Sequence, residues 1–232
     1  DYAPACMAPA NLTVTEVTPF SVTLDWTDQM SAEMWSIVYD NQTMTVFEHP
    51  VTISGLQPAT SYVFLVSTIC DGESYSSEVY TTTGCNSIAE LPYGTGFDEF
   101  ASGTMPACWE YDPATLSDNS GWLPQLYNVG DNAMLMVGNA IVMMPEFEAD
   151  LSTLMLQFDL IMGAGDNINS FEVGVYETGA AGATFVPIDT MDAFTTRMVY
   201  FDSYEGQGGR IAFRQTVPTG SFAYSFFDNV TV

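Results

Sequence analysis

Short runs in which apolar and polar residues alternate recur along the chain. Val22, Leu24 and Trp26 are separated by polar or charged residues, and residues 35–39 and 62–66 repeat the pattern. A period of two places alternate side chains on opposite faces of a β-strand. Gly, Pro, Asn and Asp separate the runs, and signals for helices are nearly absent. The pattern therefore predicts an all-β protein built from antiparallel sandwiches.

Residues 11–18 interrupt this regular alternation. Leu12, Val14 and Val17 are the apolar positions of the run, and their spacing requires a change of register near Glu16. We expect all three apolar side chains to face the interior.

A more specific motif lies between two predicted strands. The sequence Ile-Ser-Gly-Leu-Gln-Pro-Ala-Thr-Ser-Tyr ends at Tyr62. Gly55 permits a turn, Leu56 closes the bottom of the core, and the Tyr62 hydroxyl can return to the backbone a few residues upstream, as in a tyrosine corner. Together with Trp26, this motif resembles a fibronectin type III domain over residues 8–83. The resemblance implies a fold, and this fold has many roles.

Residues 92–232 contain about ten further candidate strands. The clear ones are residues 133–137, 140–144, 153–161, 170–177, 185–189, 198–202, 210–215 and 225–232. Glycine-rich turns separate them, and a pattern of this length is typical of a jelly-roll β-sandwich. We therefore divide the chain into a fibronectin type III domain at residues 1–85, a linker at 86–91 and a jelly-roll domain at 92–232.

Several short motifs of the second half extend this interpretation. They are Leu-Pro-Tyr at 91–93, Gly-Phe-Asp at 96–98, Met-Pro-Ala-Cys-Trp at 105–109, Phe-Glu-Val-Gly-Val-Tyr at 171–176, Thr-Phe-Val-Pro-Ile-Asp-Thr at 184–190, Arg-Ile-Ala-Phe-Arg at 210–214 and Phe-Asp-Asn-Val-Thr-Val at 227–232. In this order they resemble the choice-of-anchor J or cleaved-adhesin type of jelly roll. The tandem with a cysteine-bearing fibronectin domain is similar to secreted or surface proteins of Bacteroidota. The resemblance implies a non-catalytic module of an extracellular protein at the bacterial cell surface.

Four cysteines, Cys6, Cys70, Cys85 and Cys108, are widely spaced, and His49 is the only histidine. A zinc site of the usual kind therefore lacks its close ligand pairs. An even number of cysteines suits two disulfides in an oxidising compartment, with four buried thiols as the alternative and three pairings open. The poles of a fibronectin sandwich favour the pairs Cys6–Cys70 and Cys85–Cys108.

The net charge of the chain limits the class of partner that it can bind. The 232 residues include 29 acidic and three basic residues, with no lysine, so the formal net charge is −26. This charge excludes nucleic acid and anionic membrane surfaces as partners. A hydrophobic content of 47% excludes a disordered acidic tail. We also expect no transmembrane helix, no signal peptide and no direct membrane insertion, so the chain is a mature form or a segment of a longer protein.

The acidity extends over both halves. Residues 1–85 hold 10 acids and no base, and residues 86–232 hold 19 acids and three arginines. One hypothesis is that like charge prevents self-association. A second is resistance to trypsin-like proteases, which require Lys or Arg. A third is screening by divalent cations in an assembled surface layer or filament.

No catalytic constellation is present, and we expect no enzymatic activity. A Ser-His-Asp or Cys-His device would require His49, which we expect to be an exposed polar residue of a loop or strand edge. If this segment is extended, Glu146 and Glu148 share a strand face and resemble the acid/base pair of a glycosidase. Nothing in the sequence marks a cleft around them, so a solvated pair is the preferred interpretation.

The jelly-roll resemblance also implies a metal site built from acidic residues. In such domains an acid after the first strand and an acid in the last strand meet in a structural calcium site, and Asp98 and Asp228 are the matching positions. Each follows a phenylalanine that we expect to fill the core. Calcium binds carboxylate oxygens, and adjacent carboxylates repel unless a cation or proton intervenes. We therefore expect a structural Ca²⁺ ion there, with ordinary surface acids as the alternative.

Aromatic residues supply a candidate ligand site. Trp122 and Tyr127 lie in the polar, proline-containing segment 120–130 and could stack on sugars, with core or interdomain packing as the alternative. Thirteen methionines are present, and we expect those clustered in residues 134–162 to fill the jelly-roll core.

Three functions remain open. The first is a non-enzymatic extracellular surface or adhesin-type module that binds a glycan or protein on a cell surface. The second is an accessory carbohydrate-binding module of a secreted hydrolase. The third is a subunit of an extracellular filament or surface layer that binds copies of itself through edge strands such as residues 225–232.

Overall fold

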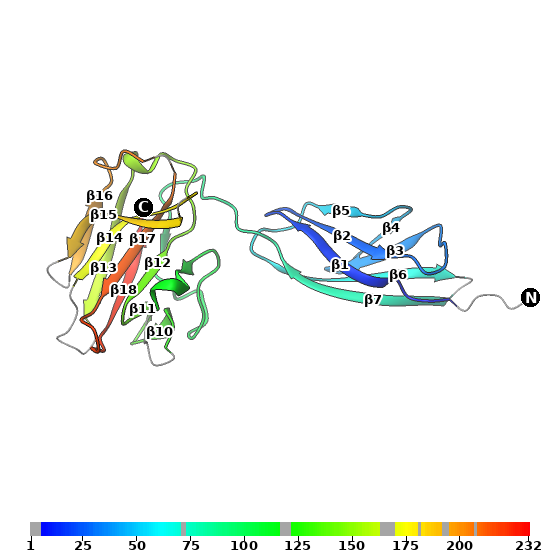
Figure 1. The fold of residues 1–232 in the computed structure, drawn as a ribbon, viewed down its shortest axis with the longest axis horizontal. Coiled ribbons are helices and arrows are strands. Elements are labelled where there is room, and N and C mark those ends of the chain that lie inside the picture. Colours follow the sequence, from blue (N-terminus) through cyan, green and yellow to red (C-terminus); the bar gives the residue numbers. More distant parts are fainter. Residues whose placement is uncertain are drawn as a thin grey trace, which may run out of the picture. The chain divides into compact units, whose positions relative to one another are not determined.

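A computed structural model describes residues 6–70, 73–116, 122–162, 170–180, 182–191, 195–206 and 208–232. The described chain is almost entirely β, which confirms the predicted class (Figure 1). It divides into two compact units, Asp1–Asn86 (unit 1) and Ser87–Val232 (unit 2). None of the helices among the described residues has the length and apolarity needed to cross a membrane.

Unit 1 consists of two antiparallel sheets (Figure 1). The first contains, in spatial order, β1 (Ala10–Val17), β2 (Ser21–Thr27) and β5 (Val51–Ser54), and the second contains β4 (Gln42–Val46), β3 (Trp35–Tyr39), β6 (Ser61–Cys70) and β7 (Glu73–Thr82). The register of β1 on β2 shifts between Val14 and Glu16, as the sequence predicts. Leu12 and Val14 pack against the core. Val17 does not: it is 39% exposed at the end of β1, the outer strand of its sheet.

The predicted tyrosine corner is present between β5 and β6. The Gln57 N–H donates a hydrogen bond of 2.9 Å to the Tyr62 hydroxyl. Gly55 has a φ of +80°, a conformation that glycine adopts without strain, and Leu56 is buried in the core. The corner therefore fixes the turn between the two sheets through one local hydrogen bond and one apolar contact.

His49 lies in a loop, as expected, but its side chain is partly buried rather than exposed. Its Nδ1 lies 2.7 Å from Asp25 Oδ1, and its ring stacks on Trp26 with centroids 4.8 Å apart. Leu24 of β2 pairs with Val51 of β5, and His49 lies in the bend just before β5, where its ring contacts Trp26.

Unit 2 consists of two larger antiparallel sheets. One contains, in order, β10 (Gln125–Asn128), β11 (Asn132–Val137), β18 (Tyr224–Thr231), β13 (Met155–Met162) and β16 (Thr196–Tyr200), with β8 (Gly94–Thr95) also paired to β18. The other contains β15 (Gly182–Met191), β14 (Ser170–Gly179), β17 (Arg210–Thr216), β12 (Ala140–Met143) and β9 (Glu110–Tyr111). Two short 3₁₀ turns, Pro113–Thr115 and Leu151–Thr153, complete the elements. Each clear strand predicted for this half is present, with ends shifted by a few residues.

The expected linker is partly structured. Ile88 forms an isolated parallel bridge with Phe147, and its N–H donates to the Glu146 carbonyl at 2.7 Å. Residues from Ser87 onward therefore belong to unit 2.

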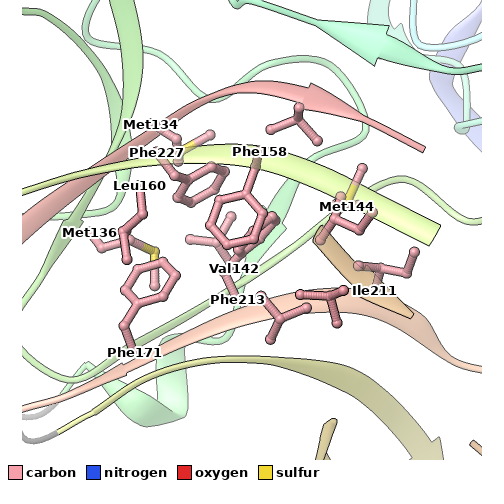
Figure 2. Close-up of a cluster of buried hydrophobic side chains, with 14 of the residues drawn as sticks. Met134, Met136, Val142, Met144, Phe158, Leu160, Phe171, Ile211, Phe213 and Phe227 are labelled. Atoms are coloured by element: carbon pink, nitrogen blue, oxygen red, sulfur yellow. The ribbon is translucent and has the colours of Figure 1, made fainter. Parts of the chain in front are cut away.

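The core of unit 2 lies between its two sheets and is rich in phenylalanine and methionine (Figure 2). Phe213 and Phe227, from opposite sheets, stack with centroids 4.0 Å apart, and Phe158 meets Phe213 edge to face at 5.1 Å. Met134 and Met136 are fully buried in the same cluster, so the expectation that methionines fill this core is confirmed for them.

The position of β18 corrects one expectation about assembly. Residues 225–232 were expected to form an edge strand, whereas β18 lies between β11 and β13 in the middle of its sheet. Its Phe227 and Val230 are fully buried, and a strand with this apolar content is stable only when it is covered. The outer strands of this sheet are β10 and β16.

Cys6 and Cys70 form a disulfide that joins the residues before β1 to the end of β6. Cys85 and Cys108 are also disulfide-bonded, and no free cysteine remains. The alternative of four buried thiols is therefore wrong. Two disulfides in a chain of this size are typical of an oxidising compartment.

The three arginines all lie within strands of unit 2. Arg197 is in β16, and Arg210 and Arg214 are in β17. Arg210 pairs with Glu110 at 2.9 Å, and Arg214 pairs with Glu172 at 2.6 Å. Arg210 and Arg214 therefore support the structure of the sheet that contains β17.

Replacing Tyr62 with Phe should lower the free energy of unfolding of unit 1 by about 1 kcal/mol, because the Gln57 N–H loses its acceptor. Native-state hydrogen exchange of the β6 amides would measure the loss. Tyr80→Phe is the matched control, because the Tyr80 side chain on β7 is 66% exposed. Equal destabilisation by both changes would contradict the role assigned to the corner.

Candidate functional site

Strand β11 is buried on both of its faces. All six of its residues are buried. Met134 and Met136 point into the main core, whereas Ala133, Leu135 and Val137 belong to a separate apolar cluster. A strand with one face in water would alternate apolar with polar residues. The outer face of this sheet is therefore apolar by sequence and must be covered by other side chains.

The neighbouring strand β18 repeats this arrangement. Phe227 points into the main core, while Phe226 joins the outer cluster with Tyr224 packed against it. Leu135 pairs with Phe226 and Val137 pairs with Tyr224 across the two strands, so the four side chains share one face.

Aromatic side chains surround a groove above this outer face, which we call the aromatic groove. Its volume is about 510 Å³, and it is lined by Trp122, Tyr127, Val129, Leu135, Val137, Phe222, Tyr224 and Phe226. Trp122, Tyr127 and Phe222 are each between 43% and 49% exposed, so their rings form accessible walls. None of the eight lining residues is charged.

Ring contacts connect the floor of the aromatic groove to its walls. Tyr127 lies against Phe226 with centroids 6.1 Å apart, and Tyr224 meets Phe226 edge to face at 5.6 Å. Phe222 lies 6.3 Å from Tyr224. The rings therefore support one another, which pre-organises the surface.

The structure thus brings together Trp122 and Tyr127, the two residues predicted as a ligand platform. Sequence reasoning missed Phe222, Tyr224 and Phe226. Their signal was an aromatic residue at every second position, which places three rings on one face of an extended chain. The first two residues of the predicted segment 120–130 lie outside the described residues.

Four carboxylates, Asp98, Asp131, Asp159 and Asp228, interact electrostatically and are called the acidic cluster below. Asp228 is 7% exposed, and burial raises the pKa of its carboxyl, with further increases from the three other aspartates. A hydrogen bond from the Asn229 N–H acts in the opposite direction. All the charged groups that shift this pKa are acidic, so the cluster repels itself when ionised.

Strand register places the acidic cluster beside the aromatic groove. Asp228 follows Phe226 by two residues on β18, and Asp159 of β13 pairs directly with Asp228. Residues two apart on a strand share a face. Asp131 lies in the turn before β11, where its carbonyl accepts a hydrogen bond of 2.9 Å from the N–H of Val129, a residue of the groove.

Local hydrogen bonds hold the acidic cluster in place. Asp98 Oδ1 accepts a bond of 3.1 Å from the Asn132 N–H, and Asn229 Nδ2 donates to Asp159 Oδ2 at 2.9 Å. Asn132 is 9% exposed, and its Oδ1 is buried without a hydrogen-bond partner. The phenylalanines that precede Asp98 and Asp228 are both fully buried in the core, as predicted.

These oxygens are of the kind that calcium prefers, yet no metal site is fully arranged. Within the described residues, no three acidic, histidine or cysteine side chains already form a group that could hold a metal ion. The structure therefore places Asp98 and Asp228 in one electrostatic cluster without showing a finished coordination shell.

A second, more polar cleft of about 340 Å³ lies over the other sheet. Glu146 lines it, so the expectation that no cleft surrounds this residue is wrong, whereas Glu148 accepts a hydrogen bond from Ser87 instead. Within the cleft Tyr176 donates to Asp112 Oδ2 at 2.9 Å, and burial together with this carboxylate raises the pKa of Tyr176 to about 12. The side chain of Arg210, which lines the same cleft, donates hydrogen bonds to two backbone carbonyls. Tyr176, Asp112 and Arg210 thus use their polar groups in hydrogen bonds that stabilise the fold.

Comparison with known proteins identifies the first unit. Residues 7–83 match the family model of the fibronectin type III domain, so this part of the chain is a fibronectin type III domain, as predicted. No curated protein sequence gives a significant match to the chain.

The chain also matches solved structures at low sequence identity and low TM-score. The fibronectin type III domain of human collagen alpha-1(XX) is 24% identical, with 38% of this chain and 93% of that chain covered at a TM-score of 0.34. A structure of carbohydrate-binding modules of the β-sandwich superfamily is 10% identical, with 99% of this chain and 100% of that chain covered at a TM-score of 0.36. A two-domain fibronectin type III segment of chicken tenascin is 11% identical, with coverages of 97% and 99% at a TM-score of 0.31. At these values none of the similarities carries a functional argument.

Acidification should stabilise unit 2 through Asp228. Because its pKa is raised in the folded protein, the folded state binds this proton more tightly than the unfolded chain does. The stabilisation is therefore complete below the ordinary pKa of 3.8 and is lost as the pH rises through the raised value.

Asp228→Asn should consequently raise the melting temperature in calcium-free buffer at neutral pH, and its advantage over the unmodified chain should shrink on acidification. Thermal melts over a pH series test this, with the exposed Asp202→Asn as control. An advantage that stays constant with pH would rule out the repulsion.

Proposed function

We propose that the chain is a non-catalytic binding module of an extracellular protein and that unit 2 binds a glycan in the aromatic groove. The observation that carries this proposal is the apolar outer face of β11 and β18, which is walled by half-exposed aromatic rings. The half-exposed rings of Trp122, Tyr127 and Phe222 leave apolar surface in water at a cost in free energy, so their presence together indicates a ligand surface.

The chemistry of the groove favours a sugar. Tyr and Trp combine a flat apolar ring with a polar tip, and a pyranose combines a flat face of C–H groups with hydroxyls at its rim. Trp122, Tyr127 and Tyr224 therefore can stack on a sugar ring and donate hydrogen bonds to its hydroxyls. The volume of about 510 Å³ lies within the range of small-molecule sites.

The remaining parts of the chain have a supporting role in this proposal. The fibronectin type III domain acts as a spacer, and two disulfides suit an oxidising, extracellular location. The motifs between residues 91 and 232 that resemble the choice-of-anchor J or cleaved-adhesin jelly roll support a place at the surface of a bacterium. A filament built through β18 is not favoured, because β18 is internal to its sheet.

Trp122→Ala should reduce glycan binding at least about tenfold, because central aromatic anchors dominate such contacts. A glycan array followed by isothermal titration calorimetry on each hit measures the loss. Phe47→Ala is a matched control, since Phe47 is an aromatic residue of unit 1 with 70% exposure. Hits that survive Trp122→Ala and Tyr127→Ala unchanged would remove the groove from the proposal. Turnover of any bound glycan would contradict the non-catalytic role.

We also propose that Asp98 and Asp228 bind a structural Ca²⁺ ion. Support comes from the mutual repulsion of the acidic cluster and from the buried Asn132 Oδ1, which has no hydrogen-bond partner. When bound, the ion would supply positive charge that neutralises the carboxylates. Asp98 and Asp228 would hold it.

Calcium should raise the melting temperature of the unmodified chain, and EDTA should reverse the change. Asp228→Asn should lose the response because it removes one charged ligand, although the same change stabilises the chain without calcium. Differential scanning calorimetry with and without Ca²⁺ measures both effects, and Asp202→Asn should respond like the unmodified chain. If chelation leaves every melting temperature unchanged, the site does not exist.

A further inference from the structure

Carboxylates lie beside one end of the aromatic groove. Along β18 the outward positions carry Tyr224, Phe226 and then Asp228, so a carboxylate stands one outward position beyond the floor of the groove. Outward positions of a strand are ~7 Å apart, which is within the Debye length of ~8 Å at physiological ionic strength. A ligand in the groove therefore lies inside the field of this carboxylate.

Two further carboxylates strengthen this field. Asp159 pairs with Asp228 across β13 and β18, and Ile161, two positions further along β13, pairs with Phe226 of the groove. Asp131 lies in the turn next to Val129, at the same end of the groove. Asp131, Asp159 and Asp228 thus lie beside residues of the groove.

The arginines lie elsewhere. Arg210 and Arg214 are on the opposite sheet, with Glu110 and Glu172 as their partners. Arg197 is on β16, which β13 separates from β18. With no lysine in the chain, neither the lining of the groove nor the strands β10, β11 and β18 beneath it contain a basic residue.

We propose that the aromatic groove selects neutral glycans and rejects acidic ones, namely those with uronic acid, sialic acid or sulfate groups. This inference rests on the proposed function, because it names the class of glycan that the groove takes. In the calcium-free chain, an acidic sugar would bring its anion next to like charges with no basic group to receive it. A neutral sugar stacks on the same rings without this penalty.

Matched pairs of oligosaccharides that differ only in charge provide the test. Suitable pairs are methyl-esterified against free oligogalacturonate, and lactose-type glycans against their sialylated forms. Calorimetry in calcium-free buffer should show binding of the neutral member and at least about tenfold weaker binding of the acidic member at low salt. Added NaCl should reduce the difference, because it screens the aspartates.

The double variant Asp131→Asn, Asp159→Asn isolates the charge. It should bind neutral glycans as the unmodified chain does and should bind acidic glycans more tightly than the unmodified chain does. Asp40→Asn combined with Glu48→Gln removes the same charge from exposed positions of unit 1 and should leave the discrimination unchanged.

The outcomes separate this inference from the function on which it rests. Equal affinity for both members of a pair, lost on Trp122→Ala, would overturn the charge selection and leave glycan binding in the groove intact. Absence of binding to any neutral or acidic glycan would overturn both. Discrimination that stays undiminished in the Asp131, Asp159 double variant would also overturn the role assigned to these two aspartates.

Discussion

Burial of β11 and β18 on both faces is the constraint on which unit 2 depends. Their inward side chains, such as Met134 and Phe227, hold the two sheets together, and their outward side chains, such as Leu135 and Phe226, form the floor of the groove. Because the period of a strand is two, a slip of one residue would exchange the two sets. The stability of the fold and the shape of the candidate site are therefore determined by the same register.

The fold was largely predictable, because alternation and turn residues are local signals. Trp26, Gly55 and Tyr62 predicted the fibronectin type III sandwich, and the strands of unit 2 were found to within a few residues. The order of strands was not predictable: whether β18 lies inside the sheet or at its edge depends on pairing between residues far apart in sequence. The same limit hid the contact of His49 with Asp25.

The candidate site was predictable in part. Trp122 and Tyr127 stood out as aromatic residues in a polar segment, and they do line the groove. Phe222 and Tyr224 did not, because apolar residues near a strand are interpreted by default as core. Only the three-dimensional arrangement shows that one face of β18 packs into the core while the other face carries aromatic rings followed by the Asp228 carboxylate. One strand therefore specifies both the apolar floor of the groove and its charged border.

The distribution of basic residues has a consequence for detection of the protein. Within these 232 residues the first arginine is Arg197, and no lysine occurs. Tryptic mass spectrometry would thus obtain no internal peptide boundary before that position, and amine-reactive dyes or crosslinkers would find no side chain to label. Proteomic surveys that use these reagents would under-count a chain of this kind, whereas cleavage at aromatic or acidic residues would reveal it.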